Sequence, residues 1–99
     1  MDRHVRYHDD FDSDLINSAE WYSNRDRQLA IDFTLRVETA VNELIADPER
    51  RSAVDYGLRY WPVERFPHIV FYDFDDKELI VLGVMHTSQE PHEWIARNA

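Results

Sequence analysis

The spacing of hydrophobic residues in the first quarter of the chain predicts a short strand followed by a helix. Polar and apolar residues alternate over residues 4–8, as they do in a half-buried strand. The spacing then becomes helical, and Asp12 or Ser13 is expected to cap the helix, which should end near residues 23–25. The apolar face of this helix is formed by Leu15, Ile16, Ala19 and Tyr22.

A longer helix is predicted over residues 27–46, where the helical spacing is clearest. Asp47-Pro48 should end it, because the residue before a proline disfavours the α conformation. Only a short polar turn separates the two helices, so they are expected to pack as an antiparallel hairpin. The apolar stripe of the second helix is formed by Leu29, Phe33, Val37, Ala40, Val41, Leu44 and Ile45, and is widened by Ala30 and Ile31.

Three strands are predicted in the second half of the chain. Residues 58–63 form a strand interrupted by Pro62, which favours a sheet edge or a bulge. Residues 68–74 and 78–86 are nearly continuous apolar runs joined by a tight acidic turn. Such runs are typical of a central strand pair that is covered on one or both faces.

Two residues near the C-terminus carry further expectations. Gly83 lies inside a predicted strand, where a glycine indicates a bulge or a close helix crossing. The tail after Pro91 is expected to form one short helical turn that packs Trp94 on the body of the protein.

These elements predict an α+β fold over a single domain, residues 1–99. The order is strand, helix, helix, strand, strand, strand and a short C-terminal turn. The N-terminal strand joins a small, mostly antiparallel sheet, and the antiparallel helical hairpin packs across one face of that sheet.

Composition narrows the class of function. The formal net charge is −9, which argues against broad nucleic-acid affinity and leaves room only for a local basic patch. The chain has no cysteine, and therefore no disulfide or thiolate zinc site. It has neither an apolar signal core nor a run long enough to cross a membrane, so a soluble, cytoplasmic protein without a membrane partner is expected.

No cofactor and no metal are expected. His4 and His8 would lie about 13 Å apart along a strand, too far to share one ion. The only glycines are Gly57 and Gly83, which rules out a phosphate-binding glycine loop or a dinucleotide fingerprint.

Several short motifs follow one another in a fixed order over nearly the whole chain. They are Asp14-Leu15, Trp21-Tyr22, Phe33, Pro48, Arg65-Phe66-Pro67-His68 leading to Tyr72, Val81-Leu82-Gly83-Val84 leading to His86, then Pro91 and Trp94. In this order they resemble the RelE/ParE superfamily of bacterial type II toxin–antitoxin toxins, and most of all its ParE, or plasmid-stabilisation, branch.

The resemblance implies a toxin that causes growth arrest by inhibiting DNA gyrase without catalysing a reaction. It also implies neutralisation by a cognate antitoxin, which can assemble with the toxin into a higher-order complex. By the resemblance, gyrase contacts are expected in residues 86–98, and antitoxin contacts over the helical hairpin and the sheet edge. The partner-binding candidates are Asp14, Trp21, Tyr22, Pro91 and Trp94.

A RelE-like ribosome-dependent messenger-RNA endonuclease is the alternative. Metal-free RNA cleavage needs a base, an acid and a cation near the phosphorane. Here His86 would act as the base and Arg65 as the phosphate clamp, with Arg59 and Tyr72 beside them. The acidic charge opposes docking on ribosomal RNA, and Thr87-Ser88 stands where such nucleases commonly carry another aromatic residue. A third alternative is a non-toxic interaction module of the same fold.

Each candidate residue also has a structural interpretation. His86 is then a hydrogen-bonded histidine at a strand end, Arg65 pairs with a carboxylate or with carbonyl groups, and Tyr72 belongs to the core or its rim. Trp21 and Tyr22 cover the seam between helix and sheet, and Trp94 anchors the tail. The first helix is strongly acidic, so an antitoxin is expected to place Arg or Lys against Asp9, Asp10, Asp12, Asp14 and Glu20.

Overall fold

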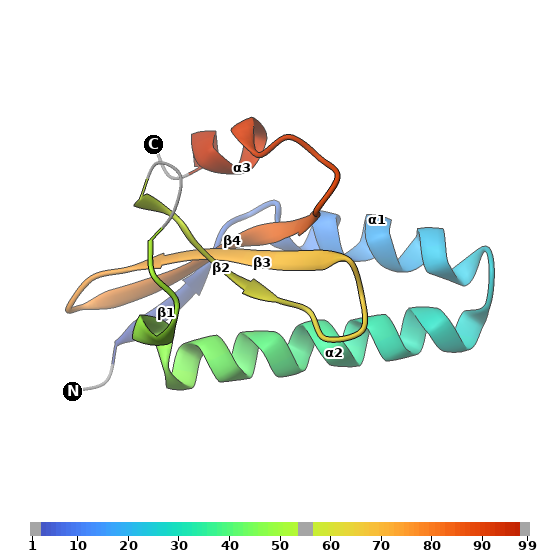
Figure 1. The fold of residues 1–99 in the computed structure, drawn as a ribbon, viewed down its shortest axis with the longest axis horizontal. Coiled ribbons are helices and arrows are strands. Elements are labelled where there is room, and N and C mark those ends of the chain that lie inside the picture. Colours follow the sequence, from blue (N-terminus) through green and yellow to red (C-terminus); the bar gives the residue numbers. More distant parts are fainter. Residues whose placement is uncertain (1–2, 54–56, 98–99) are drawn as a thin grey trace.

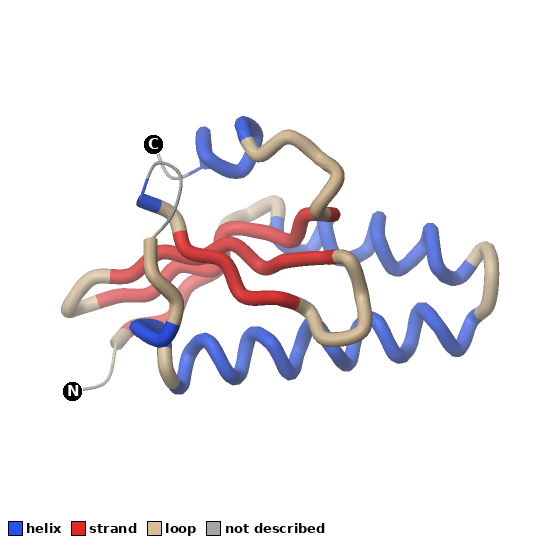
Figure 2. Tube along the Cα trace, viewed as in Figure 1, coloured by secondary structure: helices blue, strands red, loops and turns tan. Residues whose placement is uncertain are grey.

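The structure is a computed structural model that describes residues 3–53 and 57–97 (Figures 1 and 2). The observed order confirms the predicted α+β fold. The elements are β1 (His4–Tyr7), α1 (Phe11–Ser23), α2 (Arg27–Ala46), the 3₁₀ turn η1 (Pro48–Arg50), β2 (Arg59–Pro62), β3 (His68–Phe74), β4 (Glu78–His86) and α3 (His92–Arg97).

The sheet has four strands in the order β1-β4-β3-β2. β1 runs parallel to β4, and the other two pairs are antiparallel. The long apolar strands β3 and β4 are therefore central, as their sequence pattern predicts, and β2 with Pro62 lies at an edge.

Both faces of the central strand pair are covered. The α1–α2 hairpin packs on one face and α3 on the other (Figure 1). Alternate residues of β3 divide between the two cores: Val70 and Tyr72 face the hairpin, whereas Ile69 and Phe71 face α3. The core on the α3 side is formed by Leu58, Ile69, Phe71, Ile80, Leu82, Met85 and Trp94.

Gly83 marks a bulge and also a close approach, the two features that its position in a strand predicts. Phe71 pairs with Gly83 but the next residue, Tyr72, pairs with Val81, so β4 carries one extra residue there. A Cβ atom at Gly83 would overlap the side chains of Asp14 and Arg97. The bulge therefore lets α1 and α3 meet directly over β4.

The start of α1 differs from the predicted one. The helix begins at Phe11 and its N-cap is Asp10, whose side chain makes no capping hydrogen bond, so a cap at Asp12 or Ser13 was the wrong expectation. The physical reason is Phe11, the first residue of the helix, which is buried in the core. His8 Nδ1 accepts a hydrogen bond from the Asp10 N–H (3.1 Å) and helps to fix this start.

The apolar faces of the helices are narrower than predicted. Ile16, Leu29 and Ile31 are 55%, 37% and 45% exposed, because the sheet covers only one side of the hairpin. Leu35, at 55%, is exposed as well. The strand limits also differ slightly, since β1 ends at Tyr7 and β2 spans only Arg59–Pro62. Within the described part of the chain, no helix is both long and apolar enough to span a bilayer.

Candidate functional site

Tyr72 and Arg59, two of the four catalytic candidates, meet at a backbone carbonyl. The Tyr72 hydroxyl donates to the Pro48 oxygen at 2.8 Å, and Arg59 Nη1 donates to the same oxygen at 3.4 Å. Tyr72 is fully buried, and burial raises the pKa of its phenol, a shift that Arg59 opposes. In this arrangement both side chains tie η1 to the sheet.

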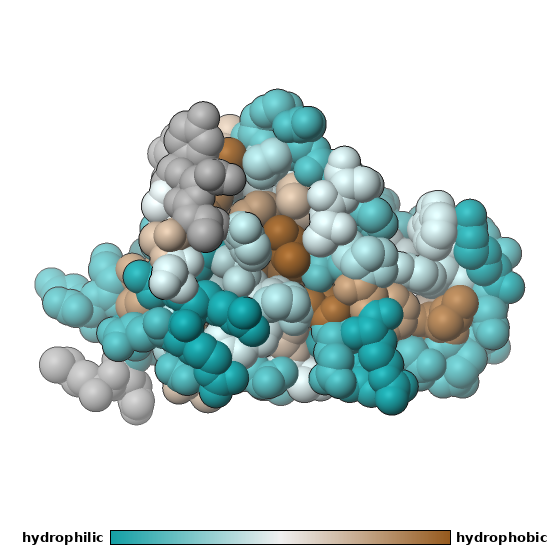
Figure 3. Space-filling view, viewed as in Figure 1, coloured by the Kyte–Doolittle hydropathy of each residue, from teal (hydrophilic) through white to brown (hydrophobic). Residues whose placement is uncertain are grey.

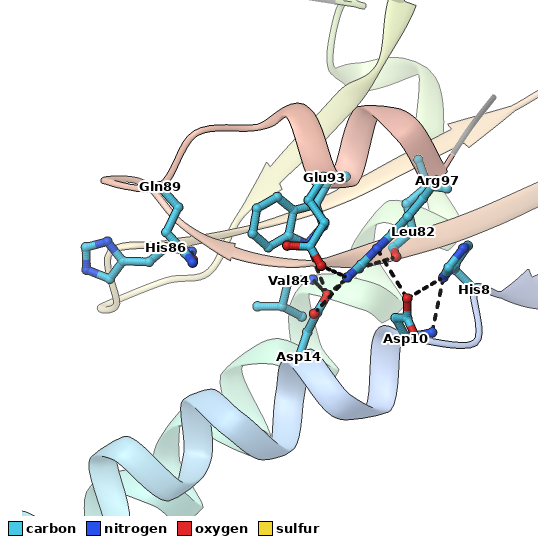
Figure 4. A network of polar contacts seen from close by, with 10 residues as sticks. His8, Asp10, Asp14, Leu82, Val84, His86, Gln89, Glu93 and Arg97 are labelled. Atoms are coloured by element: carbon cyan, nitrogen blue, oxygen red, sulfur yellow. Dashed lines mark hydrogen bonds and ion pairs between the residues drawn. The ribbon is translucent and has the colours of Figure 1, made fainter.

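His86 lies at the end of β4 and is held by the turn that follows it. Its ring Nδ1 accepts a hydrogen bond from the Ser88 N–H (3.0 Å) and lies 2.7 Å from Ser88 Oγ. The backbone N–H of His86 donates to Gln89 Oε1 (3.0 Å; Figure 4). A backbone N–H can only donate, so the neutral ring carries its proton on Nε2. The lone pair that would accept a proton from a substrate is thus already occupied.

His68 lies beside His86, with ring centroids 5.0 Å apart. It is buried between Phe33 and Tyr22, at centroid distances of 4.7 and 5.8 Å. Burial, and to a smaller extent the neighbouring His86, lower the pKa of His68 to about 4. Its Nδ1 has no hydrogen-bond partner among the described residues, so His68 stays neutral at physiological pH.

Arg65 lies at the same end of the sheet as His86 but in a different environment. It is exposed, and its φ of 73° lies in the left-handed region that costs a non-glycine residue about 1 kcal/mol or more. It forms no hydrogen bond or ion pair with another residue in the described ranges. The connection between β2 and β3, which contains Arg65, is held by the Thr87 N–H, which donates to the Pro67 oxygen at 2.9 Å.

The four catalytic candidates therefore do not converge on one point. His86 pairs with His68, and Arg59 pairs with Tyr72, four residues further along β3. That separation corresponds to about 13 Å along a strand. The structure brings Arg59 to Tyr72 but neither of them to His86.

Asp14 is held inside the molecule rather than presented on its surface. Its Oδ2 accepts hydrogen bonds from the Val84 N–H (3.0 Å), Trp94 Nε1 (3.0 Å) and Arg97 Nη1 (2.6 Å). Arg97 Nη2 donates to Oδ1 at 3.1 Å, and Nη1 also reaches the Leu82 oxygen (Figure 4). We call Asp14, Trp94 and Arg97 the α3 anchor.

The α3 anchor gives the Val84 N–H, beyond the end of the β1–β4 pairing, a hydrogen-bond acceptor, and it joins α1, β4 and α3. The Arg97 side chain is only 5% exposed, and its hydrogen bonds to Asp14 raise its pKa above the ordinary value. Asp10 and Glu93 add weaker ion pairs at 3.9 and 3.2 Å. Pro91, another partner-binding candidate, is partly exposed just before α3.

Trp21 and Tyr22 are adjacent but have opposite environments. Tyr22 is buried, in contact with Phe33, and its burial raises the pKa of its phenol. Trp21 is 53% exposed, with the Arg25 guanidinium 3.4 Å from its ring centroid. Only Trp21 of this pair is available to a partner.

A groove of about 460 Å³ lies between α2 and the β2–β3 connection. Arg36 beside it forms an ion pair with Glu64 at 3.4 Å, whereas Arg65 is free. Figure 3 shows hydrophobic residues over the half of the hairpin near the α1–α2 turn. We call the groove between α2 and the β2–β3 connection the α2 groove. Its lining is formed by Leu29, Asp32, Leu35, Arg36, Thr39, Arg65 and Phe66.

The sequence pattern missed three residues of these sites. Arg97 pairs with Asp14 across 83 residues, and no local pattern reports such a contact. Leu35 and Arg36 had a signal, since Ile31 and Leu35 are an i, i+4 apolar pair outside the core stripe. Over residues 3–53 and 57–97, no three His, Asp or Glu side chains are grouped closely enough to hold a metal ion.

Comparison with known proteins identifies the family. The model for "ParE toxin of type II toxin-antitoxin system, parDE" matches residues 5–91, most of the chain. This match places the protein among the toxins of type II toxin–antitoxin systems. The chain belongs to the ParE toxin family.

A solved structure shares the fold. It is described as "Chromosomal ParDE TA system from P. aeruginosa" and has 16% sequence identity and a TM-score of 0.74. The match covers 85% of this chain and 95% of that chain. The comparison with curated proteins gave no match.

Proposed function

We propose that this ParE-family toxin acts by binding DNA gyrase and blocking its cycle, without cleaving a substrate itself. The observation that carries the proposal is the separation of the catalytic candidates. His86 has its accepting nitrogen occupied by Ser88, while Arg59 and Tyr72 bind the Pro48 carbonyl about 13 Å away along β3. Inhibition by binding needs none of them to act as an acid or a base.

The surface proposed to contact gyrase is residues 86–98, of which Asn98 lies outside the described residues. α3 and the turn before it present mostly polar exposed side chains, and the α3 anchor holds them in one position. A surface that is already ordered loses little conformational entropy when it binds, which favours an inhibitor that acts by contact.

We also propose that a cognate antitoxin silences the toxin by covering the α2 groove and the neighbouring hairpin surface. Leu29 and Leu35 are exposed and line the α2 groove, and Ile31, one turn before Leu35, is exposed as well, which suits an amphipathic helix laid into a groove. Trp21 adds an exposed aromatic ring on the same hairpin. The antitoxin is further expected to place Arg or Lys near the exposed acids of α1, but not at Asp14, which Arg97 already pairs.

The experiment is induction of the protein in a bacterium, with viable counts and a DNA-damage reporter followed together. We expect loss of viability with the reporter switched on, because a blocked gyrase leaves broken DNA. His86→Ala should still switch the reporter on, because it removes at most one contact of the proposed gyrase surface and largely spares binding, and co-expression of the cognate antitoxin should restore viability. Growth arrest with a silent reporter that His86→Ala abolishes would instead support messenger-RNA cleavage and contradict the proposal.

A further inference from the structure

A cluster of arginines surrounds η1, the 3₁₀ turn that follows α2. Arg50 belongs to the turn itself, and Arg3 forms an ion pair with Glu49 of the turn at 3.8 Å. Arg59 Nη1 donates to the Pro48 oxygen of the same turn. Figure 3 shows strongly hydrophilic residues gathered over η1. Four of the eleven basic residues lie here, and we call them the η1 arginine cluster: Arg3, Arg50, Arg51 and Arg59.

Two aromatic rings hold the cluster in place. The guanidinium groups of Arg50 and Arg51 lie 5.2 and 5.0 Å from the ring centroid of Trp61. The other two guanidinium groups lie 4.6 and 4.5 Å from the ring centroid of Phe74. Trp61 pairs with Val70, four residues before Phe74 on β3, so the two pairs of arginines lie about 13 Å apart along the sheet. Side chains that are held in this way lose little conformational entropy when they bind a ligand.

Much of the positive charge of the cluster has no carboxylate beside it. Arg51 and Arg59 form no ion pair with another described residue, and the hydrogen bond of Arg59 ends on an uncharged carbonyl. Arg50 pairs with Asp47 at 3.0 Å, but its side chain is still 57% exposed. The cluster is therefore a local basic patch in a chain of net charge −9, and it can meet an anion.

The surface around η1 suits the backbone of a nucleic-acid duplex. Among the described residues, no large exposed hydrophobic side chain lies in η1 or on the hairpin side of β2, so a protein partner finds no apolar anchor there. Trp61 is only 3% exposed, so it offers no ring face on which an unpaired base could stack. Phosphate contacts need neither feature, and they carry no sequence information.

We infer that the η1 arginine cluster contacts phosphate groups of the double-stranded DNA that gyrase holds, so that the toxin binds both components of the gyrase–DNA complex. The inference rests on the proposed gyrase inhibition and adds DNA to the inhibited complex. One strand of a duplex carries a phosphate about every 3.4 Å along its axis, so the span of the cluster corresponds to about four base pairs. η1 and α3 lie on opposite sides of the sheet, so both contacts can form at once (Figure 1).

The acidic surface outside the cluster keeps its contact with free DNA weak. A net charge of −9 repels a polyanion, and four arginines neutralise only a few phosphates. A toxin that is bound to gyrase is held beside the DNA, and the high local concentration compensates for a weak contact. The cluster should therefore strengthen inhibition of gyrase without making the toxin a general DNA-binding protein.

The direct test is an NMR titration of the full chain with a 12-base-pair DNA duplex of mixed sequence at low salt, without gyrase. We expect the largest amide shifts at residues 49–51 and at Arg59, with a dissociation constant on the order of 10⁻⁴ M. Arg50→Gln with Arg51→Gln should weaken binding at least about 5-fold. The same double variant should lower the slope of log K against log salt by about 2, because two phosphate contacts are lost.

Arg25→Gln with Arg27→Gln is the matched control. It removes the same charge from two exposed arginines, which the length of α2, about 30 Å, separates from η1. Its affinity for the duplex should stay within about 2-fold of the wild type. Equal weakening by the two double variants, or an absence of amide shifts at η1, would overturn the inference. Displacement of the duplex by an equal concentration of octaglutamate would also overturn it, by assigning the arginines to an acidic protein.

A supercoiling assay with purified gyrase separates the inference from the proposed function. The Arg50/Arg51 variant should need about 10-fold more protein for half-maximal inhibition, while the Arg25/Arg27 variant stays within about 2-fold of the wild type. Unchanged inhibition by the Arg50/Arg51 variant would overturn the DNA contact and leave gyrase inhibition standing. A wild type that binds the duplex at η1 but does not inhibit gyrase would contradict the proposed function and retain the phosphate contact.

Discussion

Asp14 is the residue that joins most parts of the C-terminal segment to the body. Its carboxylate accepts hydrogen bonds from β4, from Trp94 and from Arg97, and its side chain is only 12% exposed. The sequence motif that contains it pointed to partner binding, but the structure shows that its acceptors are used internally. A single side chain thus satisfies the Val84 N–H where β4 has run past the end of β1.

Asp14→Asn should lower the free energy of unfolding by about 3 kcal/mol, measured by urea denaturation at pH 7. Removing the charge leaves Arg97 without its main partner in a buried position, which is costlier than losing a surface pair. Asp12→Asn is the matched control, since Asp12 is exposed in the same turn and should change stability by less than about 0.5 kcal/mol. Equal effects of the two substitutions would contradict a structural role for Asp14.

His68 should make stability depend on pH. Its pKa is about 4 in the folded protein, because burial disfavours the imidazolium, and about 6.5 in an unfolded chain. Between these values the unfolded chain binds more protons than the folded one, so stability rises with pH. The contribution is complete above pH 6.5 and is lost as the pH falls toward 4, with a total on the order of 3 kcal/mol.

The measurement is urea unfolding of the wild type and His68→Phe at pH 7, 6 and 5. Phenylalanine keeps an aromatic ring between Tyr22 and Phe33 and removes the titration. The difference in unfolding free energy between the two proteins should grow in favour of the variant as the pH falls. His4→Gln serves as the exposed control, and parallel pH profiles for the wild type and His68→Phe would contradict the assignment.

At the scale of elements, β4 and α3 depend on each other through Gly83. Gly83→Ala should lower the free energy of unfolding by about 3 kcal/mol, because the added Cβ overlaps Asp14 and Arg97 in a packed region. Gly57→Ala is the comparison: its φ of 78° strains an alanine, but nothing lies within 4 Å, so a loss of about 1 kcal/mol is expected. Urea denaturation should show a larger loss of unfolding free energy for Gly83→Ala than for Gly57→Ala. A smaller loss for Gly83→Ala would contradict the close packing of α3 on β4.

The exposed face of α2 is the part of the hairpin that we expect the antitoxin to contact. Leu35→Glu should weaken antitoxin binding at least about 10-fold, measured by calorimetry with the purified cognate antitoxin, and leave toxicity intact. The reason is that Leu35 is 55% exposed and lines the α2 groove, where a charge would meet a partner's apolar side chains.

Asn42→Glu adds the same charge on α2 about 10 Å further along, outside the α2 groove, and should bind the antitoxin as the wild type does. Equal weakening by the two substitutions would point to a general charge effect rather than to a contact at Leu35. No weakening by either would place the antitoxin elsewhere on the toxin.

At the scale of the whole molecule, the spacing of hydrophobic residues predicted the helices and strands, which depend on residues close together in the sequence. The helical spacing gave the bounds of α2 and its buried stripe from Phe33 to Leu44, and the apolar runs gave β3, β4 and the bulge at Gly83. The spacing could not show that Ile31 is exposed, because a hydrophobic residue on a helix can pack in the core or contact a partner protein.

Sites made of distant residues were not predictable in the same way. Asp14 and Arg97 come from opposite ends of the chain, and the occupied nitrogen of His86 follows from the conformation of residues 86–89. The motifs identified the right family, whereas His86, Arg65, Arg59 and Tyr72 were expected to act as one set only in the RelE-like alternative. Their separation is a property of the register between β2, β3 and β4.

The most direct test of the account is a supercoiling assay with purified gyrase, run beside a messenger-RNA cleavage assay on programmed ribosomes. Wild type and His86→Ala would be compared at equal concentrations in both. Both proteins are expected to inhibit gyrase, with a loss of no more than about 10-fold for His86→Ala, which removes one residue of the proposed contact surface, and neither should cut the messenger. Cleavage by the wild type that His86→Ala abolishes, with gyrase unaffected, would contradict inhibition by binding.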